Sequence, residues 1–252
     1  MRPNERARLD EALRPARLSA YLPDEYVGQE SFMSASEIRS LAVQAGIGPG
    51  VSVLDLCCGT AGPGLLLTRE LGCAYLGLDA SPDAVALARD RAGGLGCRFE
   101  VSQIPPVPAR PVDVVLLLET MLAFPDKGAL LAEVAGALTA GGRFACTVEE
   151  GSPLTESERA RMPNADTVWP IPLAELRRDL ERVGLQVRWL ADRSAAHRAV
   201  ADSLAVAFAA DAPNIAAHVG NRALRELLAA HQLWSDWLRE GRVRKLAIVA
   251  EK

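Results

Sequence analysis

Apolar residues gather along this chain in short runs, separated by longer stretches in which apolar and polar positions mix. The run VSVLDLC at 51–57 lacks the sustained alternation of a strand with one exposed face, and VDVVLLLET at 112–120 is more apolar still. Such runs are typical of strands buried on both faces of a parallel sheet. They predict seven strands, at 51–57, 73–80, 97–104, 112–120, 143–150, 185–192 and 243–252.

The stretches between these runs carry helix signals. The sequence SASE at Ser34–Glu37 matches a capping box and predicts a helix that runs to about Ala45. Pro63 suits the first turn of a helix over 64–71, and Ser81 suits the N-cap of the helix after the second strand. Helical patterns also cover 1–20, 126–140, 173–184 and 195–240.

Strands and helices alternate almost without exception, which predicts an α/β fold. The expected architecture is a mostly parallel, doubly wound sheet with helices on both faces. One connection, at 151–172, is polar and about 20 residues long, and compact domains seldom keep such a loop without a function. We interpret it as a lid over a substrate.

Composition narrows the class of protein. The chain has 252 residues, of which 49% are hydrophobic and 24% charged, enough for a full core. A formal net charge of −4 disfavours a nucleic-acid partner, which needs a basic surface. We expect no membrane partner and a cytoplasmic location, because no apolar run reaches the roughly 18 to 20 residues that span a bilayer. The five cysteines form no CxxC pair, so we expect reduced thiols and no metal.

The stretch VLDLCCGTAGPG at 53–64 joins a buried strand to a helix through three glycines. Glycines let a ligand approach the backbone, and a helix N-terminus offers free N–H groups. The glycines follow GxxGxG rather than the dinucleotide pattern GxGxxG, and no lysine suits a phosphate loop. Asp55 lies four residues before the first glycine. A carboxylate there would repel a pyrophosphate and attract an ammonium or sulfonium group.

A second acid, Asp79, ends the next strand in YLGLDAS. A carboxylate at this position can accept hydrogen bonds from both hydroxyls of a ribose. A glycine turn flanked by two strand-end acids fits a nucleoside that carries positive charge. S-adenosylmethionine is such a ligand.

The segments VLDLCCGTAGPG, YLGLDAS, FEVSQI, VDVVLLLETMLAFPD and LTAGGRFACTVEE, in this order, resemble the class I S-adenosylmethionine-dependent methyltransferases. Residues 26–150 are most similar to its small-molecule branch, related to quinone-biosynthesis and natural-product methyltransferases. The resemblance implies a Rossmann-like, seven-stranded sheet whose last strand is antiparallel. It also implies a helical N-terminal lid at 1–45 and a methyltransferase domain at 46–252, with the substrate lid at 151–172 inserted.

The resemblance also implies a set of cofactor-binding residues. Asp55 would face the methionine ammonium, Asp79 would hold the ribose, and an N-terminal YVGQ stretch would close over the cofactor. Two departures stand out, because Cys57 replaces a usual glycine and Gln103 a common aspartate. The full set is Tyr26, Gln29, Asp55, Cys57, Cys58, Gly59, Asp79, Ala80, Gln103, Ile104, Glu119 and Thr120.

The implied reaction is methyl transfer to an oxygen, nitrogen or carbon atom of a small-molecule acceptor. Oxygen or carbon nucleophiles need a proton removed, for which His197, Glu149 and Glu119 are the candidates. Simpler interpretations are an exposed helix position for His197 and a solvated strand end for Glu149. Residues of the lid and the last helices suggest a partly apolar acceptor: Met162, Val168, Trp169, Leu204 and Phe208.

Two other functions stay open. An enzyme of the same fold can keep S-adenosylmethionine as a scaffold and catalyse another reaction, such as a cyclisation. A nicotinamide-dependent oxidoreductase is the third interpretation, and the missing GxGxxG disfavours it.

Overall fold

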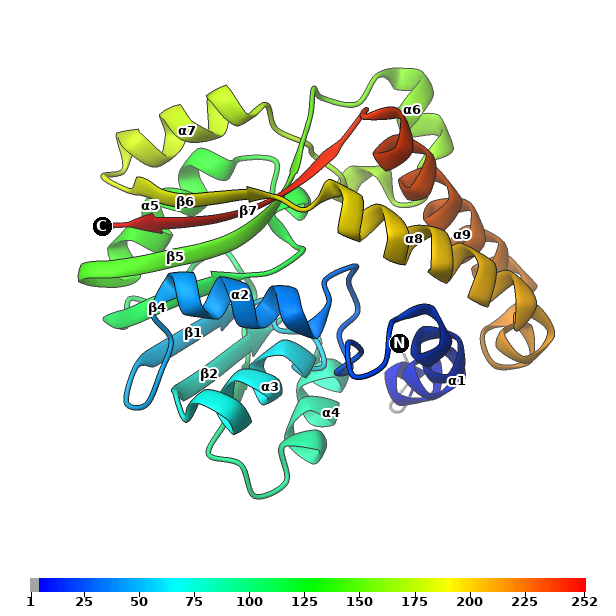
Figure 1. Ribbon diagram of the computed structural model, residues 1–252, viewed down its shortest axis with the longest axis horizontal. Coiled ribbons are helices and arrows are strands. Elements are labelled where there is room, and N and C mark those ends of the chain that lie inside the picture. The colour runs from blue at the N-terminus through cyan, green and yellow to red at the C-terminus, as the bar shows by residue number, and fades with distance from the viewer. Residues whose placement is uncertain (1–4) are drawn as a thin grey trace.

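The computed structural model describes residues 5–252 of the chain, with side chains from residue 7 onward. A seven-stranded sheet forms its centre, in the order β3-β2-β1-β4-β5-β7-β6 (Figure 1). The last strand, β7, runs antiparallel to both of its neighbours, and the other pairs are parallel. The expected topology is confirmed. The strands are β1 (Ser52–Leu56), β2 (Ala74–Asp79), β3 (Arg98–Val101), β4 (Val112–Leu117), β5 (Leu138–Glu150), β6 (Gln186–Asp192) and β7 (Arg244–Glu251).

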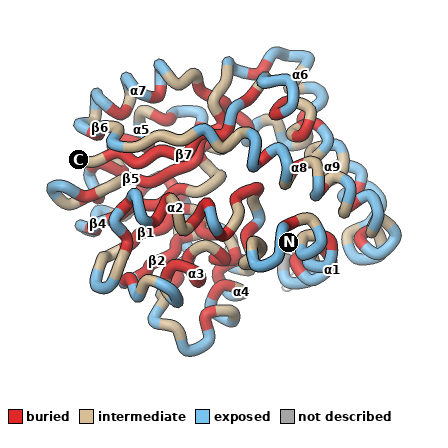
Figure 2. Tube along the Cα trace, in the orientation of Figure 1, coloured by how far each residue is buried: buried red, intermediate tan, exposed pale blue. Residues whose placement is uncertain are grey.

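Helices cover both faces of the sheet, as the alternation predicts. One face packs against α2 (Ala35–Ala45), α3 (Gly62–Leu71) and α4 (Pro82–Ala92), whose apolar residues share a buried cluster with outward residues of β1, β2 and β4. The other face packs against α5 (Lys127–Ala137) and α7 (Leu173–Arg182). Figure 2 shows the buried positions concentrated in the strands and on the helix faces turned toward them.

A third group of helices stands beyond the carboxyl ends of the parallel strands. It consists of α1 (Glu5–Ala20), α8 (Ser194–Ala210) and α9 (Ala212–Glu240), which lie together at one end of the sheet in Figure 1. Their shared apolar cluster includes Leu13 of α1, Phe208 of α8 and Leu224 of α9. Phe32, from the segment between α1 and α2, joins the same cluster. Ligands bind at this end of doubly wound sheets, so these helices wall the expected site.

The predicted helix signals form as expected. Ser34 accepts a hydrogen bond from the backbone of Glu37, and the Glu37 side chain returns one to the backbone of Ser34. The helix that this capping box begins ends at Ala45, where Gly46 adopts a left-handed conformation. Ser81 caps α4 in the same manner through the backbone N–H of Ala84.

One predicted boundary is wrong, and one segment predicted as a loop contains regular structure. The helix expected over 126–140 ends at Ala137, and β5 already begins at Leu138. The chain extends there because Gly141 and Gly142 exchange backbone hydrogen bonds with Lys252, at the end of β7. The segment 151–172 is also more ordered than a plain loop, since it contains the short helix α6 (Glu156–Arg161) and the 3-10 turn η2 (Ala165–Thr167). A capping box between Thr155 and Glu158 starts α6.

Candidate active site

A pocket opens where β1, β2 and β4 end, under the segment that joins α1 to α2. Its cavity volume is about 240 Å³. We call the segment at residues 25–33, which lies over the glycine turn, the strap. The lining residues are Gly28, Gln29, Glu30, Ser31, Asp55, Cys57, Cys58, Gly59, Thr60, Ala61, Gly62, Pro63, Asp79, Leu118, Glu119 and Thr120.

The glycine turn holds its shape through backbone contacts with the second strand. The Cys58 N–H donates to the carbonyl of Leu78 at 2.9 Å, and the Gly59 N–H donates to Asp79 Oδ2 at 2.8 Å. Asp79 Oδ1 accepts a further hydrogen bond from Ser81, also at 2.9 Å. Each carboxylate oxygen of Asp79 therefore keeps a lone pair for a ligand hydroxyl.

Two residues without glycine's freedom adopt a left-handed conformation in this turn. Cys57 has φ 59° and Ala61 has φ 62°. Small side chains tolerate such a turn best, which supports a packing role for Cys57. Burial, together with the carboxylates of Asp79 and Asp55, raises the pKa of the Cys57 thiol to about 12. The thiol therefore stays protonated, and no redox role follows from it.

Asp55 lies at the floor of the pocket and is almost fully buried. It accepts a hydrogen bond of 2.5 Å from the Tyr75 hydroxyl. A Cβ atom on Gly64 would lie 2.1 Å from the Tyr75 ring, so the bare glycine makes room for this contact. Burial raises the pKa of Asp55 to about 7, although the Tyr75 hydrogen bond lowers it in part. A cationic ligand would therefore find the carboxyl poised to ionise.

The strap is in close backbone contact with the glycine turn. A Cβ atom on Gly62 would lie 2.5 Å from the Gly28 carbonyl carbon, so only glycine permits this approach. The Gln29 side chain fixes the fold of the strap, because its amide bonds Val27 at 2.6 Å, Glu25 at 2.9 Å and Met33 at 2.8 Å. Gln29 therefore shapes the strap even though it also lines the pocket.

Most of the predicted cofactor-binding residues meet at this pocket. Those that line it are Gln29, Asp55, Cys57, Cys58, Gly59, Asp79, Glu119 and Thr120. The other four lie outside the lining. Tyr26 packs with Tyr21, their ring centroids 5.4 Å apart, Ile104 is buried in the core, and Ala80 and Gln103 are exposed. Their contact with a cofactor stays a prediction.

Glu119 stands at the end of β4 with φ 56°, a strained conformation for its residue type. Its N–H donates to Thr147 Oγ1 at 2.5 Å, which anchors the turn. Its carboxylate accepts a hydrogen bond of 2.8 Å from Lys245 Nζ, and Lys245 also pairs with Glu149. This backbone conformation therefore directs the Glu119 carboxylate across the carboxyl ends of the strands.

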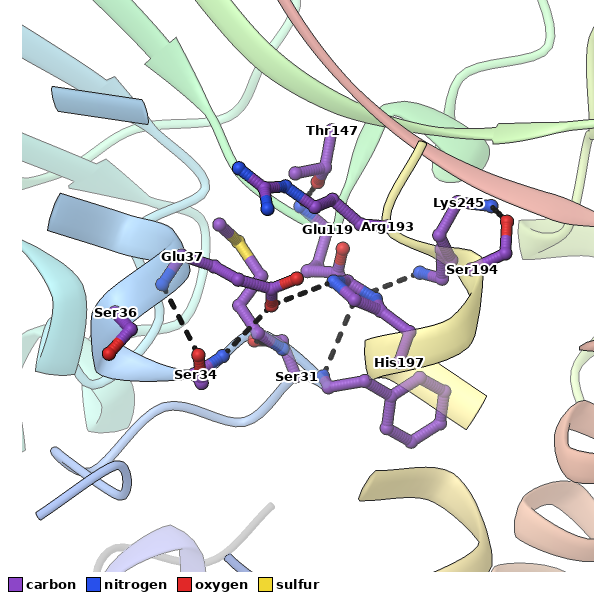
Figure 3. Close-up of polar contacts among 12 residues, drawn as sticks. Ser31, Ser34, Ser36, Glu37, Glu119, Thr147, Arg193, Ser194, His197 and Lys245 are labelled. Carbon is purple, nitrogen blue, oxygen red and sulfur yellow. Dashed lines mark hydrogen bonds and ion pairs between the residues drawn. The ribbon is translucent and has the colours of Figure 1, made fainter. Parts of the chain in front are cut away.

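The Glu119–Lys245 ion pair is part of a buried row of charged side chains, which also contains Glu37 and His197 (Figure 3). His197 Nε2 lies 3.1 Å from Glu37 Oε2, and His197 Nδ1 lies 3.8 Å from Glu119 Oε2. Burial would raise the pKa of Glu119, but Lys245 and His197 lower it to about 2. Lys245 keeps its proton, since both carboxylates raise its pKa despite burial.

These positions overturn two of the simpler interpretations. His197 is only 1% exposed, so it is not an exposed helix residue. Glu149 is 2% exposed, so it is not a solvated strand end. The ion-pair partner of Glu149 could not be read from local patterns, because Lys245 lies 96 residues after it.

A second pocket adjoins the first and has a cavity volume of about 220 Å³. Phe32, Leu122, Ala230 and Trp234 give it apolar walls, and Glu149, His231 and Lys245 contribute polar groups. The two pockets share three lining residues, Glu30, Ser31 and Glu119. They therefore meet at the strap and the end of β4.

The residues predicted to shape a substrate site from the lid and last helices line neither pocket. Leu204 and Phe208 are buried in the cluster of α1, α8 and α9, and Met162 and Val168 in a cluster between segment 151–172 and α9. Trp169 lines a separate surface pocket. This prediction is wrong in its residues, because amphipathic helices turn their apolar faces toward one another here.

The first pocket suits a positively charged nucleoside. Its charged lining residues are the carboxylates Asp55, Asp79, Glu30 and Glu119, and no lysine, arginine or histidine lines it among the described residues. No group of three or more metal-ligating side chains occurs in residues 5–252. No helix in that range is long and apolar enough to cross a membrane.

Residues 53–142 match a family described as a methyltransferase domain, and this match spans the glycine turn, Asp79 and Glu119. This segment of the chain is similar to the methyltransferase domain of the class I S-adenosylmethionine-dependent methyltransferases. Members use S-adenosylmethionine as cofactor, which agrees with the acidic pocket lining.

Curated relatives are similar over part of the chain. Phosphoethanolamine N-methyltransferase 1 of Arabidopsis thaliana is 29% identical over 146 residues, 55% of this chain and 30% of that protein. Fatty-acid O-methyltransferase of Mycolicibacterium smegmatis is 35% identical over 112 residues, 43% of this chain and 40% of that protein. The matches thus span well under half of these relatives' length.

A solved structure, that of the [4+2]-cyclase SpnF, superposes with a TM-score of 0.75. The superposition covers 96% of this chain and 93% of that one at 20% identity. Likeness at this identity establishes the shared fold alone.

Proposed function

We propose that this chain transfers the methyl group of S-adenosylmethionine to a small molecule bound in the second pocket, which we call the acceptor pocket. One observation carries the proposal. The acceptor pocket and the acidic pocket share the lining residues Glu30, Ser31 and Glu119, so a ligand in each would lie against the same three residues. Methyl transfer needs the nucleophile and the methyl group about 3 Å apart and in line, and we propose that the two ligands meet in this way beside these residues.

The cofactor residues follow from the acidic lining. Asp79 would accept the ribose hydroxyls, and Asp55 would face the methionine ammonium. We also propose that Tyr26, Ala80, Gln103 and Ile104 lie at the adenine side, as the family resemblance implies. When bound, the cofactor supplies a methyl group activated by a positive sulfur atom. The protein's part is then to orient the acceptor and to exclude water.

The acceptor pocket indicates the kind of substrate. Phe32, Leu122, Ala230 and Trp234 give it apolar walls beside its polar and charged groups, a mixture typical of sites for small molecules. A partly apolar acceptor therefore fits, and a natural product is a compound of this kind. Among the predicted catalytic residues, Glu119 and Glu149 would shape the charge of this pocket through Lys245, and His197 would support Glu119 from behind.

The test is a transfer assay with methyl-labelled S-adenosylmethionine and a panel of small phenols, carboxylic acids and amines. We expect label in at least one acceptor, with one S-adenosylhomocysteine formed per methyl group. Asp79→Ala should abolish this transfer, and Asp90→Ala should preserve it, because Asp90 is an exposed acid on α4 away from the pocket.

The same assay examines the cyclase alternative. Conversion of a substrate that requires S-adenosylmethionine but incorporates no label and releases no S-adenosylhomocysteine would contradict methyl transfer and favour a cofactor used as a scaffold. No conversion and no cofactor binding would remove the proposal altogether.

A further inference from the structure

The Glu119 carboxylate at the acceptor pocket is a poor proton acceptor. Glu119 and Glu149 both pair with the Lys245 ammonium, and this pairing holds the pKa of Glu119 at about 2. A base of that strength does not take a proton from a hydroxyl or an ammonium group at neutral pH. An acceptor that must lose a proton therefore needs another group.

His197 does not act as this proton acceptor either. Both of its ring nitrogens are buried without an aligned hydrogen-bond partner, and they face Glu37 and Glu119. His197 lines neither the acidic pocket at the glycine turn nor the acceptor pocket. Its imidazole therefore has no opening toward a substrate.

His231 is the histidine that lines the acceptor pocket. It lies on α9 and packs edge-to-face between two aromatic rings, with centroid distances of 6.0 Å to Phe32 and 4.8 Å to Phe208. This packing fixes the plane of the imidazole. A ring held in this way presents the same edge to every ligand.

The hydrogen bond of His231 sets its tautomer. Nδ1 lies 2.9 Å from the carbonyl oxygen of Leu227, one helical turn earlier. A carbonyl oxygen only accepts, so in the neutral ring Nδ1 carries the hydrogen and Nε2 carries a lone pair. Nε2 has no hydrogen-bond partner within residues 5–252, and it is not among the buried unpartnered atoms. It is therefore accessible at the pocket that His231 lines.

We propose that His231 is the general base of the reaction, and that the acceptor carries a hydroxyl or a protonated amine. This inference rests on the proposed methyl transfer. The acceptor's oxygen or nitrogen forms a bond to the methyl carbon as the carbon–sulfur bond breaks, and the pair of that bond stays on sulfur. The acceptor's proton passes to Nε2, directly or through one water, before a protonated amine attacks or as a hydroxyl attacks, and His231 later releases it to solvent.

The surroundings favour the neutral imidazole. Burial lowers the pKa of His231, the Leu227 carbonyl raises it, and Arg17 on α1 lowers it further. The other charged groups of the pocket are Glu30 of the strap, Glu119, Glu149 and Lys245, and α8 contributes the apolar Phe208. The base form therefore persists at a lower pH than for an ordinary histidine.

The decisive variant is His231→Phe, which keeps an aromatic ring between Phe32 and Phe208. The probe is the panel phenol or amine that wild type methylates fastest. We expect kcat to fall by about 100-fold or more, the usual contribution of a general base, while S-adenosylmethionine binds as in wild type. The rate of the variant should rise with pH and recover with a more acidic phenol, results that a purely structural role would not give.

The matched control is His218→Phe. His218 lies on the same helix and makes the same contact, with Nδ1 2.9 Å from the Asn214 carbonyl, but it is exposed and lines no acceptor pocket. Its kcat should equal that of wild type. A loss of less than about threefold in His231→Phe would overturn the base role and leave methyl transfer standing, because a general base contributes at least about 100-fold.

A second measurement needs no variant to fold. In ¹⁵N-histidine-labelled wild type, the His231 signal should show an unprotonated Nε2 and a protonated Nδ1 at pH 7.5. The opposite tautomer would overturn the base role. If wild type methylates nothing in the panel, methyl transfer fails and the base role fails with it, an outcome distinct from an active His231→Phe variant.

Discussion

Asp55 is the residue at which burial and chemistry oppose each other most directly. Burial favours the protonated carboxyl and raises its pKa from 3.8 to about 7. A ligand ammonium or sulfonium group favours the ionised form. The raised pKa means that the ligand-free protein loses stability as pH rises from about 4 to about 7, while the ionised site becomes available to a cation over the same range.

Cofactor binding should therefore depend on pH. We expect the Kd of S-adenosylhomocysteine to increase by up to about tenfold per pH unit below about pH 7, because binding then requires Asp55 to lose its proton. Titration calorimetry from pH 5.5 to 8.5 measures this. Asp55→Asn should bind weakly with a flat profile, whereas Asp79→Asn should bind weakly and keep the slope. An unchanged slope in Asp55→Asn would exclude Asp55 as its origin.

Lys245 is the second residue, and we expect its substitution to change the free energy of unfolding strongly. Lys245→Met leaves Glu119 and Glu149 buried without their cation and should lower the free energy of unfolding by about 3 to 5 kcal/mol. Arg244→Ala is the neighbouring control. Its pair with Glu150 is 45% exposed on the arginine side, so its loss should cost less than about 1 kcal/mol.

Denaturant unfolding of both variants decides between these values. Adding Glu119→Gln and Glu149→Gln to Lys245→Met should restore part of the loss, because no buried charge is then left unpaired. Equal losses in Lys245→Met and Arg244→Ala would show that the buried row of charges does not stabilise the fold.

Single residues were predictable where their role is local. Asp55, Asp79 and the glycine turn lie next to strand ends, and their meeting follows from parallel strands ending at one edge. Lys245 could not be predicted, because its partners are fixed only when β4, β5 and β7 pair. His231 carries no local signal, since its place at the acceptor pocket depends on how α9 packs against Phe32.

The strap is the element that completes the cofactor pocket. It contributes Gly28, Gln29, Glu30 and Ser31 to the lining, and the Thr60 hydroxyl ties it to the glycine turn through the Gly28 carbonyl at 3.3 Å. The YVGQ resemblance predicts a closing segment at Tyr26 and Gln29. Glu30 and Ser31, the next two residues, were missed because no periodicity marks a segment without regular structure.

A methyl group at the contact between strap and glycine turn should separate the two elements. Gly62→Ala would place its Cβ atom against Gly28 and Gln29, so we expect at least a tenfold weaker S-adenosylhomocysteine affinity and reduced stability. Gly136→Ala is the matched control, because nothing lies within 4 Å of its Cβ position on α5. It should stabilise the protein by up to about 1 kcal/mol. Affinity unchanged in Gly62→Ala would contradict the role of the strap.

Elements with strong local signals were predicted well, and those set by long-range pairing were not. The capping box of α2 and the N-cap of α4 form as expected. The start of β5 at Leu138 was missed, because the contact of Gly141 and Gly142 with Lys252 outweighs the apparent helix pattern. The short helix α6 within segment 151–172 was also missed. It begins at a capping box of Thr155 and Glu158, which lies in a polar segment.

At the scale of the whole molecule, the alternation of strands and helices was enough to predict the doubly wound sheet and its binding edge. The helices α1, α8 and α9, separated by most of the chain, pack together at that edge, and α9 lines the acceptor pocket. Their packing decides which atoms face a substrate. The sequence therefore located the cofactor pocket but not the acceptor pocket.

The central claim is that the acidic pocket binds S-adenosylmethionine. Calorimetric titration of wild type with S-adenosylmethionine, S-adenosylhomocysteine and NADH tests it most directly, with Asp79→Ala and Asp90→Ala alongside. We expect both sulfur nucleosides to bind with micromolar Kd, a binding free energy of about −8 kcal/mol, and NADH to give no heat. Of the two variants, only Asp79→Ala should bind them at least tenfold more weakly. Binding of NADH without the sulfur nucleosides, or an Asp79→Ala variant that binds them like wild type, would contradict it.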